Sequence, residues 1–178
     1  MRYYDNTYIR SLYSPGYSSL LLSLYKTNLT LGFTPWVGRL NQYEQKGFRS
    51  TSIDYEKAAA LCLLAKPILE GNHNYPVYYA IPCNNDATLI LELKQDRDGQ
   101  MRSYLTLEKK REQITFQFST QTYKVNENGK MVEKVIQAGL GVFILTLEAY
   151  LTGIDIGGHL SKQSANESGN THSQAPVW

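Results

Sequence analysis

The strongest constraint on what this chain can fold into is a period-two alternation of apolar and polar residues in RSYLTLEKKREQITFQF, residues 102–118. This alternation is typical of strands that bury one face and expose the other. The apolar positions, predicted to face the core, are Leu105, Leu107, Ile114, Phe116 and Phe118. The polar positions are Arg102, Tyr104, Thr106, Thr115 and Gln117. The segment predicts an antiparallel hairpin whose polar face is either a solvated surface or a binding surface.

Further strands are predicted on both sides of this hairpin. Leucines alternate with polar residues in 18–25 and continue on one face of 28–33, across a short Lys26-Thr27 connection, which predicts a second hairpin. Pro35 ends it because proline has no N–H to donate to a strand ladder. Strands are also predicted at 77–82, 87–94 and 122–125, whereas 36–50 is predicted to be a polar, basic loop.

A first helix is predicted over TSIDYEKAAALCLLAKPILEGN, residues 51–72, because good helix formers dominate it. Ser52 or Asp54 can cap it, since a short side-chain oxygen accepts from the free N–H groups of the first turn. Pro67 is expected to kink or end the helix, because it removes one backbone hydrogen bond. Gly71-Asn72 is a stop signal.

A second helix is predicted from Lys130 to about Leu151, after a turn at Asn128-Gly129. Its apolar residues form a broad face that we expect to pack on a sheet and on a partner subunit. Gly139 and Gly141 each cost about 1 kcal/mol of helix propensity. They indicate either a close backbone approach or a weak point in the helix.

The order strands, helix, strands, helix predicts an α+β fold with curved antiparallel sheets, each followed by an amphipathic helix. At 178 residues the chain is expected to form one domain, at 18–156. A Tyr-rich irregular segment at 1–17 precedes it, and a disordered tail at 157–178 follows. Asn28–Leu31 echoes Tyr104–Leu107, and Tyr55–Lys57 echoes Val132–Lys134. These echoes fit either a duplicated unit or chance.

Enzyme signatures are absent from the sequence. The three histidines have no Cys or second His at zinc-ligand spacing, and no nucleophile elbow or phosphate-binding glycine loop occurs. Asp96 and Asp98 lie in QDRDGQ, which is typical of a hairpin turn rather than a metal site. We therefore predict a non-enzymatic protein without a cofactor or a metal ion.

Several features indicate an intracellular setting. The stretch MRYYDNTYIRSLYS has no apolar run of the kind found in secretory signals, and no segment is long and apolar enough to span a membrane. Cys62 and Cys83 are not expected to form a disulfide framework. The expected location is the cytoplasm.

The polar faces of the predicted strands interleave aromatic rings, cations and hydroxyls. Lys94, Arg102 and Tyr104 are predicted to share a face with Tyr123 and Lys124. Such a mixture suits single-stranded nucleic acid, because bases stack on flat rings while Lys and Arg neutralise phosphates. An ordinary solvated sheet face with cross-strand aromatic pairs remains the alternative. The net charge of +2 does not decide between them.

Three segments carry a resemblance to a known family: KTNLTLGFTP (26–35), STSIDYEKAAALCLLAKPIL (50–69) and ATLILELKQDRDGQMRSYLTLE (87–108). With the order of elements, they resemble the Whirly and positive-cofactor-four superfamily of single-stranded DNA-binding proteins, and above all its small phage or plasmid members. The Lys-Gly-Lys-Ala-Ala-Leu signature of plant Whirly proteins is missing, and Glu56–Leu61 is only an echo of it. The resemblance implies binding on strand faces, in replication or recombination, by an oligomer in a phage-infected or plasmid-bearing bacterial host.

The predicted interface has two kinds of residue. Phosphates are expected to contact Lys94, Arg102, Lys109, Lys110, Arg111, Lys124 and Arg39, and bases are expected to stack on Tyr104, Tyr123 and Trp36. A homo-oligomer is expected to form through the helix at 130–151. The alternatives are an RNA-binding protein of the same fold and a structural or protein-interaction module that uses that helix.

Overall fold

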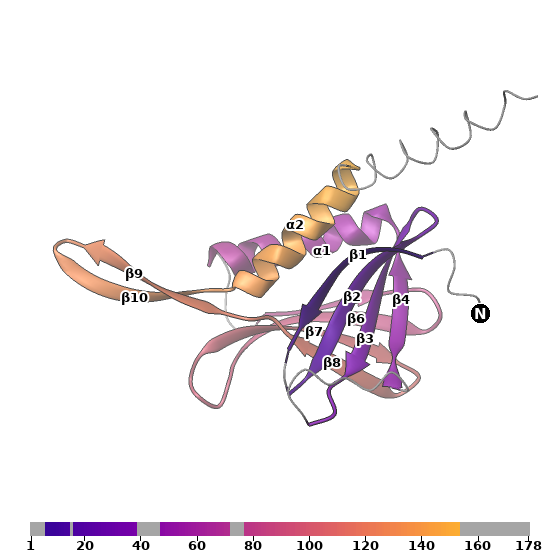
Figure 1. Ribbon diagram of the computed structural model, residues 1–178, viewed down its shortest axis with the longest axis horizontal. Coiled ribbons are helices and arrows are strands. Elements are labelled where there is room, and N and C mark those ends of the chain that lie inside the picture. Colours follow the sequence, from indigo (N-terminus) through magenta and orange to yellow (C-terminus); the bar gives the residue numbers. More distant parts are fainter. Residues whose placement is uncertain (1–5, 15, 39–46, 72–76, 154–178) are drawn as a thin grey trace, which may run out of the picture.

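The computed structural model describes residues 6–14, 16–38, 47–71 and 77–153, which form two four-stranded sheets, a two-stranded ribbon and two helices (Figure 1). The first sheet has the order β1-β2-β3-β4 and is wholly antiparallel. Its strands are β1 (Asn6–Tyr13), β2 (Ser18–Tyr25), β3 (Asn28–Pro35) and β4 (Arg49–Ile53), and α1 (Tyr55–Glu70) follows them.

The second half repeats this order and adds one element. An antiparallel sheet of order β5-β6-β7-β8 is followed by a ribbon and then by a helix. The bounds are β5 (Val77–Pro82), β6 (Ala87–Gln95), β7 (Met101–Lys109), β8 (Glu112–Gln117), β9 (Gln121–Glu127), β10 (Lys130–Ile136) and α2 (Ala138–Thr152). The predicted α+β class and the order strands, helix, strands, helix are confirmed.

Two strands replace segments that the sequence predicts to be irregular. β1 lies in the segment predicted to be irregular at 1–17. β4 covers the last two residues of the loop predicted at 36–50 and the first three residues of the segment predicted as the first helix, so that helix begins only at Tyr55. The pairing of β1 with β2 is interrupted between Tyr8 and Arg10, where the register shifts at a bulge. A bulge inserts one residue and so breaks the period-two pattern by which strands are recognised. The predicted tail at 157–178 lies outside the described residues.

The caps of α1 are those predicted, with Asp54 rather than Ser52 at the N-terminus. Asp54 Oδ1 accepts from the backbone N–H of Lys57 at 2.9 Å, and Gly71 ends the helix with a φ of 74°. The expectation that Pro67 kinks or ends the helix is wrong as to its end, because α1 continues to Glu70. Pro67 removes one bond in the last turn, but the Gly71 N–H bonds back to the carbonyl of the buried Ile68 at 3.3 Å.

The helix predicted at 130–151 is wrong in its first seven residues. Lys130–Ile136 pairs in full register with Gln121–Glu127 as a ribbon, and the helix begins only at Ala138. Asn128 and Gly129, with φ of 53° and 81°, form the two-residue turn between the strands. Asn-Gly is the preferred dipeptide for such a hairpin because both positions require positive φ. The residues at 122–125 form a strand as predicted, but within this ribbon.

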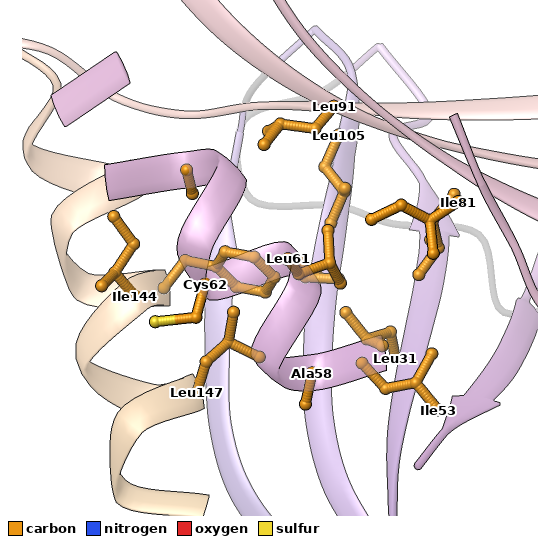
Figure 2. Close-up of a cluster of buried hydrophobic side chains, with 14 of the residues drawn as sticks. Leu31, Ile53, Ala58, Leu61, Cys62, Ile81, Leu91, Leu105, Ile144 and Leu147 are labelled. Carbon is orange, nitrogen blue, oxygen red and sulfur yellow. The ribbon is translucent and has the colours of Figure 1, made fainter. Parts of the chain in front are cut away.

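The core lies where α1 packs between α2 and the strands of both sheets (Figure 2). In the close-up, Leu61 lies on the strand side of α1, whereas Cys62 lies on the α2 side with Ile144 and Leu147. The side chains predicted to be buried in the 102–118 hairpin are confirmed, four of them almost fully buried and Ile114 partly exposed. Cys62 and Cys83 are free thiols.

One of the two sequence echoes matches the architecture. Asn28–Leu31 begins β3 and Tyr104–Leu107 lies in β7, and each is the third strand of its sheet. The other echo does not match, since Tyr55–Lys57 opens α1 whereas Val132–Lys134 lies in β10. The ribbon is therefore an addition between β8 and α2, at the point where the first half passes directly from β4 to α1.

Candidate nucleic-acid interface

The polar face of the second sheet is more deeply covered than its alternation predicts. Tyr104 is 3% exposed and Thr106 is 5% exposed, although both point away from the leucines of the core. The hydroxyls of Thr106 and Thr115 lie 2.9 Å apart across β7 and β8. Much of this face is a hydrogen-bonded second layer rather than an open surface.

Tyr104 is held as a structural residue. Its ring lies 5.7 Å from the ring of Tyr17, and its hydroxyl accepts from Gln117 Nε2 at 3.0 Å. Burial raises the pKa of the Tyr104 phenol to about 12. A base cannot stack on a ring whose surface is covered, so the prediction that Tyr104 stacks bases does not fit this structure.

Lys94 and Arg102 lie together as predicted, but acidic side chains surround them. Arg102 Nη2 donates to Asp98 at 2.5 Å, and its Nε lies 3.3 Å from Asp96 without the alignment of a hydrogen bond. The backbone N–H of Gln100 and the Arg102 guanidinium lower the pKa of the Asp98 carboxyl. Lys94 Nζ lies 3.3 Å from Glu92 and 4.7 Å from the centre of the Tyr104 ring. These partners leave the cluster little net positive charge for a phosphate.

The turn between β7 and β8 carries three consecutive cations, Lys109, Lys110 and Arg111, which we call the cationic tip. Lys109 is half-buried and its Nζ donates to the backbone carbonyl of Ser50 at 3.3 Å. Lys110 and Arg111 are exposed, and neither forms an ion pair with any described residue. A hollow of about 290 Å³ beside them is lined by Arg49, Lys109, Lys110 and Glu112.

Lys110 and Arg111 occupy strained backbone positions, with φ of 50° and 69°. The left-handed region costs an ordinary L-residue roughly 1–2 kcal/mol, and tight hairpin turns therefore favour Asn-Gly. The ribbon of the same chain uses Asn128-Gly129 in the equivalent turn. In the cationic tip, Lys110 and Arg111 thus occupy backbone positions where Asn and Gly would have a lower conformational free energy.

The remaining predicted residues do not join this cluster. Tyr123 and Lys124 are exposed but belong to the ribbon, on opposite faces of it, and Lys124 pairs in register with Glu133. Trp36 is half-buried beyond the end of β3, and its backbone N–H donates to the backbone carbonyl of Tyr17 at 3.1 Å. The prediction of one surface containing Tyr104, Tyr123 and Lys124 is wrong. Arg39 lies outside the described residues.

Sequence reasoning missed a second surface, the outer face of the first sheet, which we call the hydroxyl face. It consists of Tyr8, Ser11, Tyr13, Ser19, Leu21, Ser23, Tyr25, Asn28, Thr30, Gly32, Thr34, Ser50 and Ser52. None of the four strands contains Asp or Glu. Its exposed part is at the β1 edge, where Tyr8 and Tyr13 are 64% and 62% exposed, whereas Ser23 and Thr30 are 4% and 9% exposed and the Phe48 ring lies against Gly32. The signal was present in the Ser- and Tyr-rich strands, but the bulge in β1 concealed it.

The cationic tip contacts the β4 edge of the first sheet. The Lys109 contact with Ser50 joins the two sheets, and Arg49 Nε donates to Glu112 Oε2 at 2.7 Å beside it. The hydrogen bond with Glu112 raises the pKa of the Arg49 guanidinium and lowers that of the Glu112 carboxyl. The cations of the tip and a sheet whose strands contain no Asp or Glu therefore adjoin one another.

Tyr104 provides a pH-dependence prediction. Its folded pKa of about 12 exceeds the usual 10, so its contribution to stability is complete below pH 10 and is lost as the pH rises toward 12. Burial also raises the pKa of the Tyr150 phenol, so an ultraviolet titration of phenolate should show a late-ionising phase that Tyr104→Phe reduces and does not abolish. The matched control Tyr78→Phe, at an exposed position on the same sheet face, should leave that late phase in place. Loss of the late phase in the control alone would contradict the assignment.

The described residues contain neither a group of side chains that could bind a metal ion nor a helix that could span a membrane. No three His, Cys, Asp or Glu side chains in these ranges are grouped so that they could hold a metal ion. Neither of the helices described is long and apolar enough to cross a membrane.

No protein-family model matches the chain, and no curated protein matches it. Among solved structures it is similar to one described as "Structure of the plant transcriptional regulator PBF-2", with 14% identity and a TM-score of 0.42. The alignment covers 95% of this chain and 91% of that chain. At this identity the roles of individual side chains rest on this chain's own geometry.

Proposed function

We propose that the protein is a non-enzymatic, cytoplasmic protein that binds single-stranded DNA without sequence preference, in replication or recombination. The observation that carries the proposal is the cationic tip, where Lys110 and Arg111 occupy left-handed positions and lack ion-pair partners among the described residues. Strained backbone that is retained against cheaper alternatives tends to occur at functional sites. The tip adjoins a sheet whose four strands contain no Asp or Glu, and Glu112, which lines the hollow beside the tip, is already bonded to Arg49.

The composition of this surface favours single strands over duplexes. An exposed tyrosine ring such as that of Tyr8 offers a stacking platform, and stacking contributes about 1–3 kcal/mol per base whatever the base is. Duplex readers usually place a basic helix in the major groove. Here α1 has as many acidic as basic residues, and α2 has one charged residue, Glu148. Membership among the small phage or plasmid proteins of the Whirly-like group stays a prediction.

The direct test is a titration of oligo-dT, oligo-rU and duplex DNA over a range of salt concentrations. We expect oligo-dT to bind with a log–log salt slope of about −0.7 per neutralised phosphate. Equal affinity for oligo-rU would assign the protein to RNA as well, since stacking and phosphate contacts are common to both nucleic acids. Failure to retard an oligo-dT of about 30 nucleotides at low salt, several times the site size of one binding fold, would contradict the proposal.

Exchanging the strained turn separates stability from binding. Lys110→Asn with Arg111→Gly is expected to raise the free energy of unfolding by about 1–2 kcal/mol, because it removes left-handed strain. The same variant should bind oligo-dT about 10-fold more weakly at low salt, with a slope shallower by about 1.4. Denaturant unfolding and fluorescence anisotropy measure the two quantities.

The matched control removes two cations from the ribbon instead. Lys124→Asn with Lys130→Asn deletes the same charge at a distance from the tip, and we expect the oligo-dT affinity to change less than about two-fold. Equal weakening by both double variants would show that only net charge matters and that the tip is not a site.

A further inference from the structure

The ribbon of β9 and β10 extends away from the two sheets and exposes apolar side chains (Figure 1). Met131 is 65% exposed, and Val135, Tyr123 and Ile136 are between 42% and 48% exposed. A two-stranded hairpin alone in water is marginally stable at best. A regular seven-pair ribbon with this much apolar surface therefore calls for a covering surface.

The two faces of the ribbon differ. Tyr123, Val125, Val132 and Ile136 share one face, which we call the apolar ribbon face, together with an ion pair between Lys134 and Glu127. Val125 and Val132 pair directly with each other at its centre, and both are half-buried. Met131 and Val135 lie on the opposite face with Lys124 and Glu133.

The root of the ribbon is fixed to the second sheet. Gln137 is 9% exposed. Its Oε1 accepts two hydrogen bonds from Ser103, one from the backbone N–H at 3.2 Å and one from the side-chain hydroxyl at 2.9 Å. Its Nε2 donates to the Met101 carbonyl at 2.7 Å. The N–H of Gly139 bonds to the Ser119 carbonyl at 2.8 Å, and a Cβ at Gly139 would lie 2.6 Å from Ser119 N. This confirms the close approach that the sequence raised for Gly139. The ribbon therefore leaves the body in a fixed direction.

The helices present a second apolar surface, which we call the helix groove. It lies between α1 and α2, has a volume of about 560 Å³, and includes Ala59, Cys62, Leu63, Leu145, Ala149 and Leu151. Leu63 and Leu145 are 68% and 63% exposed, which is unusual for leucines on two helices that pack together. An ion pair of Lys66 with Glu148, 2.6 Å apart, lies in the groove.

We propose that two copies of this chain assemble about a two-fold axis, each laying its apolar ribbon face over the helix groove of the other. The dimensions agree: seven strand residues span about 23 Å, and the fifteen residues of α2 span about 22 Å. The apolar ribbon face carries Lys130, Lys134 and Glu127, and the helix groove carries Lys66 and Glu148, so each surface offers both signs of charge to the other. Each copy has one ribbon and one groove. In a two-fold dimer each ribbon covers the partner's groove, so no ribbon or groove is left to bind a third copy.

The occupant is a second copy rather than nucleic acid because of the charges present. The apolar ribbon face has a net charge of only +1, from Lys130, Lys134 and Glu127, and the groove has one charge of each sign. A polyanion would gain little from either surface, whereas apolar strands and helices gain from burying one another. The inference does not depend on the proposed function.

Neighbouring residues on opposite ribbon faces provide a matched test. Val132→Glu places a charge at the centre of the apolar ribbon face, and we expect it to weaken self-association about 100-fold or more, since a buried unpaired charge is costly. Met131→Glu makes the same change on the other face and should leave self-association intact. Sedimentation velocity over a range of protein concentrations measures both, with circular dichroism to confirm folding.

Mixing two defective variants tests which surfaces meet. Val132→Glu spoils the ribbon but keeps the groove, and Leu145→Glu spoils the groove but keeps the ribbon. Each alone should be monomeric, whereas an equimolar mixture should recover dimers through one intact ribbon–groove contact. A monomeric wild-type chain at tens of micromolar, the range expected of even a weak specific dimer, or a mixture that stays monomeric, would overturn the proposal. So would variants on both ribbon faces that weaken oligo-dT binding equally while self-association is unchanged.

Discussion

Phe118→Ala is expected to lower the free energy of unfolding by about 3–5 kcal/mol, which is the cost of truncating a fully buried phenylalanine. Phe118 is 0% exposed, and its ring lies 5.1 Å from that of Phe116 and 5.4 Å from that of Phe143. The substitution therefore opens a cavity where β8 meets α2 and removes two aromatic contacts at once. Urea unfolding followed by circular dichroism measures the effect.

The control for this prediction is an exposed aromatic residue of the same sheet. Tyr78 is 61% exposed on β5, and Tyr78→Ala should change the free energy of unfolding by no more than about 0.5 kcal/mol. A loss below about 2 kcal/mol for Phe118→Ala, well under the range for buried phenylalanines, would mean that the second sheet and α2 pack less tightly than described.

Gln137→Ala is expected to cost about 2–4 kcal/mol, because it removes three hydrogen bonds and leaves buried groups of β7 without partners. Ser103 N–H, the Ser103 hydroxyl and the Met101 carbonyl all depend on the Gln137 amide. At the size of this chain the loss corresponds to a fall in Tm of roughly 4–16 °C. Differential scanning calorimetry measures it.

Gln113→Ala is the matched control for Gln137. The Gln113 amide is exposed and donates to Glu108 at 2.7 Å across β7 and β8, where water can replace it. Its loss should stay within about 0.5 kcal/mol. Hydrogen exchange adds a second readout: Gln137→Ala should raise exchange across Gln121–Ile136 more than in β5 and β6. Uniform exchange throughout the chain would indicate that Gln137 does not fix the ribbon root.

Local chemistry was sufficient to predict the core strands and the first helix. Leu105, Leu107 and Phe116 follow a clean period of two, and Asp54 and Gly71 are among the caps that the sequence offers. These elements obey local rules because one face of each is buried on the central core. The order of elements, and with it the α+β class, follows from them.

The ribbon was mispredicted because two signals conflicted. Val132 and Ile136 lie four residues apart, as on one face of a helix, and apolar and charged residues come in pairs over 131–136 instead of alternating as on a strand. Asn128-Gly129, a strong hairpin signal, decides for the strand once β9 is recognised as its partner. The β-branched residues also favour a strand over a helix.

The candidate site was only partly predictable. The cationic tip is evident from three consecutive cations, but the left-handed backbone at Lys110 and Arg111 is a property of the turn. Burial of Tyr104 depends on Tyr17, which lies 87 positions earlier in the chain and follows β1. Alternation tells which side of a strand a residue faces, and cannot tell what else covers that side.

The hydrogen bond between Gly139 and Ser119 has an evolutionary consequence. It joins the residues that flank the ribbon, with Gly139 N and Ser119 O 2.8 Å apart, so the ribbon begins and ends at neighbouring points of the protein body. Lengthening a segment with fixed ends costs little, because the closure entropy grows only with the logarithm of its length. Descendants of this chain could extend, shorten or replace the ribbon without changing the strand order of either four-stranded sheet. We expect divergence among related chains to concentrate there first, with new binding partners acquired by that route.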